Sequence, residues 1–117
     1  MCSYIRRYNC SSRFGISRRN DRFEWDDEKN RRNIEKHGLD FADAEGMFRS
    51  GLLCCPDIRE DYGERRWIGI GKIQGRTAVV IFVDRGEDNI RIISLRKANQ
   101  RESRQYEKTI KDELETR

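Results

Sequence analysis

His37, the one histidine of the 117-residue chain, shares a predicted helix face with three other polar residues. The four occupy positions i, i+4, i+7 and i+8 of one segment: Lys29, Asn33, Lys36 and His37. A helix places residues at these spacings along one stripe. Ile34 is the one large apolar residue of this segment. Two interpretations therefore remain open: the stripe is a solvated helix face, or it forms one wall of an anion-binding site.

His37 itself supports two interpretations. It stands directly before Gly38, and a glycine after a helical segment is typical of a left-handed helix end. There a histidine complements the negative end of the helix dipole. Alternatively, its imidazole titrates near neutrality and takes or gives a proton in a reaction. Position alone favours the helix-end interpretation.

The predicted strand NIRIISLR carries two arginines and a serine that suit a phosphate site. Strict alternation puts Ser94 and Arg96 on one face and Arg91 on the other. The first face also holds Ile90 and Ile92. Arg91 and Arg96 line one pocket only if a bulge or the strand end intervenes. Arg96, at the strand end, either clamps a phosphate through two parallel hydrogen bonds or is an ordinary edge arginine.

A second group of charges stands at the start of another predicted strand. In the segment GERRW, Glu64 precedes Arg65 and Arg66, so alternation offers one arginine to each face of the sheet. The sequence contains no Gly-rich phosphate loop, nucleophile elbow or paired-carboxylate motif. The four cysteines, two of which are adjacent, lack the spacing of a metal site. We therefore predict no metal.

Length and composition indicate one small, strongly charged domain. Of the residues, 35% are hydrophobic and 39% charged, and the net charge is +4, which fits one modest core. Residues 1–22 hold six arginines against one acid and show no periodicity, so we predict a basic, flexible N-terminal arm. No apolar run approaches a membrane span or a signal peptide. These features predict a cytoplasmic protein without membrane association, and the basic segment 89–111 suits RNA or an acidic partner.

Periodicity predicts a single α+β domain over residues 23–117. The expected elements are a short strand at 23–25, helices at 26–37 and 40–50, strands at 52–57, 65–73, 76–85 and 89–96, and a helix from residue 99. Gln74-Gly75 predicts a tight turn. Asn99 with Glu102 predicts a capping box. The expected fold is two N-terminal helices, a four-stranded antiparallel β-sheet with 76–85 at its centre, and a C-terminal helix.

Three motifs in this order resemble those of the BrnT family of bacterial toxins. The first has the pattern W-D-x-x-K-x-x-x-N-x-x-K-H-G-hydrophobic-x-F, matched by Trp25, Asp26, Lys29, Asn33, Lys36, His37, Gly38, Leu39 and Phe41. The second is an E-R-x-aromatic strand start, matched by Glu64, Arg65 and Trp67. The third is R-I-I-S-x-R-x-A, matched by residues 91–98. The resemblance spans about residues 23–110; Leu95 stands where alanine is usual, and residues 1–22 have no counterpart.

The resemblance implies a ribonuclease toxin with a RelE-like fold. It also implies a DNA-binding antitoxin of the BrnA type that holds the toxin inactive in a hetero-oligomer and alone contacts operator DNA. The expected activity is endonucleolytic RNA cleavage that inhibits translation and growth, without a metal or cofactor. The RNA 2′-hydroxyl attacks the adjacent phosphate, while the protein transfers protons and stabilises the developing charge.

The residues predicted to serve this activity are charged or polar. The catalytic candidates are His37, Lys29, Glu64, Arg66 and Arg96. The RNA-binding candidates are Asn33, Lys36, Arg91, Ser94 and Arg101. The acid or base remains open between His37, Lys29 and Glu64. An alternative function is a non-enzymatic module that binds the antitoxin and tunes its DNA binding.

Overall fold

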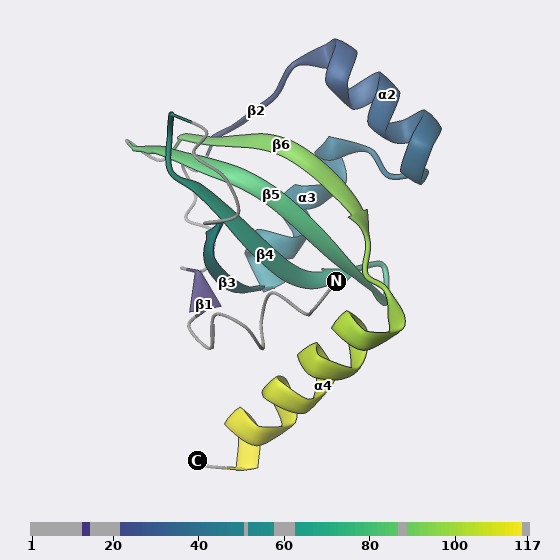
Figure 1. Ribbon diagram of the computed structural model, residues 1–117, viewed down its shortest axis with the longest axis vertical. Coiled ribbons are helices and arrows are strands. Elements are labelled where there is room, and N and C mark those ends of the chain that lie inside the picture. The colour runs from purple at the N-terminus through teal and green to yellow at the C-terminus, as the bar shows by residue number, and fades with distance from the viewer. Residues whose placement is uncertain (1–12, 15–21, 51, 58–62, 87–88, 116–117) are drawn as a thin grey trace.

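The computed structural model describes residues 13–14, 22–50, 52–57, 63–86 and 89–115, which form one sheet and its flanking helices (Figure 1). In chain order the elements are β1 (Arg13–Phe14), β2 (Arg22–Glu24), α2 (Asp27–His37), the 3-10 helix η1 (Phe41–Asp43), α3 (Ala44–Ser50), β3 (Leu52–Asp57), β4 (Arg66–Ile73), β5 (Arg76–Gly86), β6 (Asn89–Lys97) and α4 (Gln100–Glu115). In Figure 1, α2 runs beside β6, and α4 leaves the sheet where β6 ends. The predicted α+β class is confirmed.

The sheet has the strand order β1-β3-β4-β5-β6-β2. Its four longer strands form the predicted antiparallel meander, with β4 and β5 at the centre. The β4–β5 hairpin turns at Gln74 (φ 51°) and Gly75 (φ 82°). Positive φ at both central residues matches the twist of the flanking strands, so the predicted tight turn is confirmed.

The prediction of a four-stranded antiparallel sheet is wrong in number and in direction. Six strands are present, and β2 pairs parallel to β6 through Phe23↔Ile90 and its neighbours. At the other edge, β1 pairs antiparallel with β3. Strands of two or three residues show no periodic pattern, and their partners lie far along the chain. The sequence suggested a strand at 23–25 but could not show what it pairs with.

The second predicted helix begins as a tighter turn. Asp40 caps it through a hydrogen bond from Ala42 N, and Asp43 N donates to Asp40 O over three residues. The chain therefore starts as the 3-10 helix η1 and becomes α-helical only at Ala44. Phe41, Ala44 and Phe48 face the core.

Helix α2 has the predicted ends. Asp26 accepts a hydrogen bond from Lys29 N at 3.0 Å, and Gly38 adopts a φ of 72° while its N–H donates to Ile34 O. The predicted capping box at α4 is also present, because Asn99 and Glu102 each accept from the other's main-chain N–H. Both helices therefore start where their sequence signals place them.

Two apolar clusters lie on opposite faces of the sheet because residues of the central strand alternate. Val80 and Phe82 of β5 join residues of η1 and α3 in the first cluster. Val79 and Ile81 belong to the second cluster, which includes Tyr106 of α4. We refer to these as the α3 face and the α4 face of the sheet. Burial on both sides explains why β5 is a continuous apolar run.

Most of the predicted arm, residues 1–22, lies outside the described residues, so its predicted flexibility stays a prediction. Within it, Arg13–Phe14 and Arg22 are described, and both segments are strands of the sheet. In the described part of the chain, no helix is long and apolar enough to cross a membrane.

Candidate functional site

A bulge in β6 decides which face its arginines occupy. Ile81 pairs with Ser94, but the next residue of β5, Phe82, pairs with Ile92. Ile93 is thus an extra residue in β6, and it packs in the cluster of the α4 face. An extra residue of this kind inverts the alternation of all residues that follow it.

As a result, Arg91, Ser94 and Arg96 share the α4 face. Arg91 alternates with Ile90 and Ile92, which lie in the cluster of the α3 face, so it points to the opposite side. Beyond the bulge, Arg96 pairs with Val79, a residue of the α4 face. The expectation that strict alternation separates Arg91 from Arg96 is therefore wrong, and the predicted exception, a bulge, is what occurs.

Arg96 is bound to the start of α4. Its Nη1 and Nη2 donate to Glu102 Oε1 and Oε2 at 2.8 and 2.9 Å, and Nη1 also lies 3.2 Å from Lys97 O. Glu102 is only 3% exposed, whereas the Arg96 side chain is 31% exposed. Burial would raise the pKa of the Glu102 carboxyl, but hydrogen bonds from Arg96 and Asn99 outweigh it and lower the pKa. The pair therefore presents a partly exposed guanidinium on a buried, ionised carboxylate.

His37 ends α2 within electrostatic range of Arg96. Its pKa lies below the ordinary value of 6.5 because burial disfavours the imidazolium and because Lys36 and Arg96 add positive charge nearby. At neutral pH the imidazole is therefore predominantly uncharged and able to accept a proton. The helix-end interpretation of His37 is confirmed, because His37 occupies the last turn of α2 before Gly38. The interpretation that it transfers a proton stays a prediction.

Asn33 fixes the position of α2. Its amide donates to Leu95 O at 2.7 Å and to Leu39 O at 3.0 Å, and it accepts from Leu95 N at 3.2 Å. The side chain is buried. We assign Asn33 a structural role rather than the predicted RNA contact, because its polar atoms already bind main-chain groups.

The predicted site residues divide between the two ends of the sheet. Lys36, His37, Arg96 and Arg101 lie near the end of β6, where α2 ends and α4 begins. Four lie at the opposite end: Lys29, Glu64, Arg66 and Arg91. Ser94 lies between Arg91 and Arg96 along β6, and Asn33 lies beside Leu95. Arg91 and Arg96 are five residues apart, or about 16 Å in an extended strand.

At that opposite end the arginines are paired with acids. Arg91 Nη1 lies 3.0 Å from Glu24 Oε2 of β2, and Arg66 Nε lies 3.3 Å from Glu64 Oε2. Arg66 shares its face with Ile68, which belongs to the α4 face. The five catalytic candidates thus form no single cluster, because Arg66 begins β4, which is separated from β6 by β5.

Four predicted site residues share the α4 face, and we call them the cationic row: Arg66, Arg91, Ser94 and Arg96.

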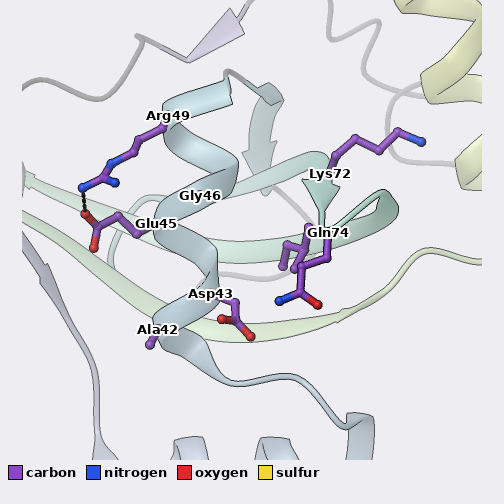
Figure 2. Close-up of a pocket in the computed structure, with 8 residues that line it drawn as sticks. Ala42, Asp43, Glu45, Gly46, Arg49, Lys72 and Gln74 are labelled. Atoms are coloured by element: carbon purple, nitrogen blue, oxygen red, sulfur yellow. Dashed lines mark hydrogen bonds and ion pairs between the residues drawn. The ribbon is translucent and has the colours of Figure 1, made fainter.

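Two hollows lie at the β4–β5 hairpin. One, of about 290 Å³, extends from Gly38 to Lys97, the residues that follow His37 and Arg96, and also touches Arg76. The other, of about 550 Å³, lies between α3 and the hairpin. Figure 2 shows Asp43 and Gln74 pointing into it, while Arg49 binds Glu45 on the outer side of α3. Its charges are mixed, and none of the predicted site residues lines it.

Sequence reasoning recognised Glu102 as half of a capping box and missed its bond to Arg96. The only sequence signal of this ion pair was an acid six residues after a strand-end arginine, and that spacing is too common to indicate a pair. Burial of the carboxylate could not be inferred from the sequence.

Comparisons with known proteins identify the family. Residues 25–102 match a family described as "Ribonuclease toxin, BrnT, of type II toxin-antitoxin system". The chain is also similar to the crystal structure of the Brucella abortus ribonuclease toxin BrnT, determined at 1.1 Å resolution. The two are 34% identical with a TM-score of 0.54, and the match covers 69% of this chain and 100% of that one. The search of curated proteins found no match.

A small α+β domain with a cationic sheet face and these relatives falls in the class of ribonuclease toxins of type II toxin–antitoxin systems. Within that class, the chain belongs to the BrnT family. The resemblance seen in the three motifs is thereby confirmed.

Proposed function

We propose that this chain is a metal-independent endoribonuclease whose reaction takes place between His37 and Arg96. The observation that carries the proposal is the contact of α2 with the end of β6: Asn33 bonds the main chain of Leu95, so the last turn of α2, with His37, lies near the strand end where Glu102 fixes the guanidinium of Arg96. The lowered pKa of His37 leaves its imidazole uncharged at neutral pH. The imidazole can accept a proton, and the guanidinium can stabilise negative charge on a phosphate. Both belong to the chain that matches ribonuclease toxins.

In the proposed reaction the RNA 2′-hydroxyl attacks the adjacent phosphorus. His37 takes the hydroxyl proton as the O2′–P bond forms, and Arg96 binds the phosphate oxygens as they gain charge. The P–O5′ bond then breaks. The 5′ oxygen takes a proton from solvent, and the other product retains a 2′,3′-cyclic phosphate.

We assign the cationic row to RNA binding. Arg91 and Arg66 lie on the face of Arg96, and Ser94 adds a hydroxyl between Arg91 and Arg96 along β6. Lys36 and Arg101 are exposed beside the reaction site and would contact neighbouring phosphates. Lys29 is also exposed, at the far end of α2, so it contributes charge to binding rather than a proton to the reaction. Glu64 holds Arg66.

The biological setting follows from the family. A type II toxin is neutralised by a protein antitoxin, and we propose a DNA-binding partner of the BrnA type in a hetero-oligomer that reaches operator DNA through the antitoxin. Free toxin would act in the cytoplasm, where cleavage of RNA inhibits translation and growth. A fold of the RelE type would be consistent with this role.

The test is RNA cleavage by antitoxin-free protein in the presence of EDTA. We expect fragments with cyclic-phosphate ends. Arg96→Lys keeps a charge beside the buried Glu102 but loses the two-pronged geometry, so cleavage should fall sharply while the fold persists. Lys97→Ala is the matched control because Lys97 alternates to the α3 face. Intact RNA with folded protein would refute the proposal.

Expression in a bacterium lacking the antitoxin separates the proposal from a non-enzymatic module. Growth arrest that Arg96→Lys relieves supports cleavage. Harmless expression of folded, antitoxin-binding protein supports a module that only tunes its partner's DNA binding.

A further inference from the structure

We infer that Glu102 is a positioning residue, which acts by fixing the guanidinium of Arg96 for the phosphate; this role rests on the proposed function. Glu102 is the most deeply buried carboxylate among the described residues, at 3% exposed. A buried charge is stable only when it is paired and hydrogen-bonded, and Arg96 supplies the counter-charge.

The bond between the two side chains is bidentate. Both terminal nitrogens of Arg96 meet both oxygens of Glu102, at 2.8 and 2.9 Å. Two parallel bonds fix the plane of the guanidinium, which a single bond does not. Without them, a long side chain at a strand end samples several rotamers and loses entropy when it binds phosphate.

Glu102 is itself held from the other side. Its Oε1 accepts from Asn99 N at 3.0 Å, and its own N–H donates to Asn99 Oδ1 at 2.8 Å. Ala98, which precedes Asn99, donates its N–H to Thr77 O of β5 at 3.0 Å. The helix start is thus tied to β5, and the carboxylate is tied to the helix start. The support for Arg96 is therefore rigid.

The capping bond alone does not explain the acid. Glutamate and glutamine both serve at this position of a capping box, because either oxygen can accept from Asn99 N–H. Only a carboxylate offers two equivalent acceptors to the two guanidinium nitrogens. Glu102→Gln therefore keeps the cap and removes one of the two bonds to Arg96, which separates helix capping from positioning.

The experiment measures RNA cleavage by Glu102→Gln. We expect kcat to fall on the order of 10²-fold, the loss that a displaced catalytic group can cause, with KM nearly unchanged. Glu107→Gln is the matched control: it removes an acid from the same helix, and its ion-pair partner is Lys72 rather than Arg96. It should cleave like the unsubstituted protein.

A double-mutant cycle identifies the partner. In the Arg96→Lys background, Glu102→Gln should cause no further loss of kcat, because the geometry it supports is already gone. Equal losses in both backgrounds, or full cleavage by folded Glu102→Gln, would overturn the inference.

NMR of the arginine side chains tests positioning without relying on activity or on the folding of a variant. In the unsubstituted protein, Arg96 should show resolved terminal N–H signals, because its guanidinium rotates slowly. Averaged signals would overturn the inference even if RNA is cleaved. If the unsubstituted protein cleaves no RNA but the Arg96 signals are resolved, the proposed function fails. Glu102 then restrains the Arg96 side chain without a role in catalysis.

Discussion

The amide of Asn33 forms two hydrogen bonds with the main chain of Leu95, donating to its carbonyl at 2.7 Å and accepting from its N–H at 3.2 Å. The Asn33 amide therefore satisfies the main chain of β6 in the way that a neighbouring strand would. Strand β2 pairs with this edge of β6 only as far as Arg91. Helix α2 lacks an apolar face, and this polar contact takes its place. Because Leu95 precedes Arg96, the same contact sets His37 relative to Arg96.

Replacing Asn33 with alanine should destabilise the protein by at least about 2 kcal/mol, because buried main-chain groups of Leu95 and Leu39 lose their partners. Urea unfolding measures this. Lys36→Ala, on the exposed surface of the same helix, should change stability by no more than about 0.5 kcal/mol. Equal stability of the Asn33 variant and the unsubstituted protein would show that α2 is held by other contacts.

The two glycines Gly69 and Gly46 should respond oppositely to alanine. A Cβ on Gly69 of β4 would collide with Leu52 Cδ1 and lie 3.1 Å from Val80 Cγ1, both in the packed α3 face. Gly69→Ala should therefore cost about 1–3 kcal/mol. Gly46→Ala, in α3 with open space around the added carbon, should gain up to about 1 kcal/mol from helix propensity. Thermal unfolding of both variants checks the contrast, which a stabilised Gly69→Ala would contradict.

The parts of the fold that could be predicted are those with local signals. Helix ends were predictable because Asp26, Gly38 and Asn99 act on main-chain groups within a few residues. The four longer strands were predictable because their apolar residues are continuous or alternate. The parallel pairing of β2 with β6 was not predictable, since it joins Phe23 to Ile90 across most of the chain.

The site was less predictable than the fold. Residue types made Arg91, Arg96 and His37 candidates, but the face of each arginine depends on the bulge at Ile93. A bulge without glycine has no sequence signal. Likewise, Asn33 matched the spacing of a polar site stripe, yet it packs inward because β6 leaves main-chain groups there to be paired. Long-range hydrogen bonding decided both outcomes.

Cleavage should depend on the protonation of His37 in a defined direction. Its pKa is lowered from 6.5 by burial and by the charges of Lys36 and Arg96. As a base it works uncharged, and kcat/KM reports the pKa of the free protein, so kcat/KM should rise with pH through a midpoint below 6.5 and be level at neutrality. His37→Gln should lower kcat by about 10²- to 10⁴-fold and abolish this rise of the rate with pH. A midpoint of this pH dependence above 6.5, or the same pH dependence in His37→Gln, would show that His37 is not the base.

The same shift affects stability. Between the folded pKa and 6.5 the unfolded chain binds more protons at His37 than the folded chain does. Stability should therefore rise with pH across this window and be lost as pH falls below 6.5. Unfolding measured at several pH values should show a weaker dependence in His37→Gln over this window. Glu102, whose pKa is lowered from 4.5, loses its stabilising ionisation only at more acidic pH, so the two groups can be separated.

Arg91 should serve binding rather than the chemical step, because it lies about 16 Å along β6 from Arg96. With 2′-O-methylated RNA, which lacks the attacking hydroxyl, Arg91→Ala should weaken binding and reduce the slope of log K against log salt by about 0.7 for one lost phosphate contact. In cleavage assays KM should rise while kcat changes little. Arg49→Ala removes the same charge from α3, beside Glu45 and away from the cationic row, and should leave the salt slope unchanged. If Arg49→Ala and Arg91→Ala reduce the slope equally, RNA responds only to net charge, and the α4 face is not its binding surface.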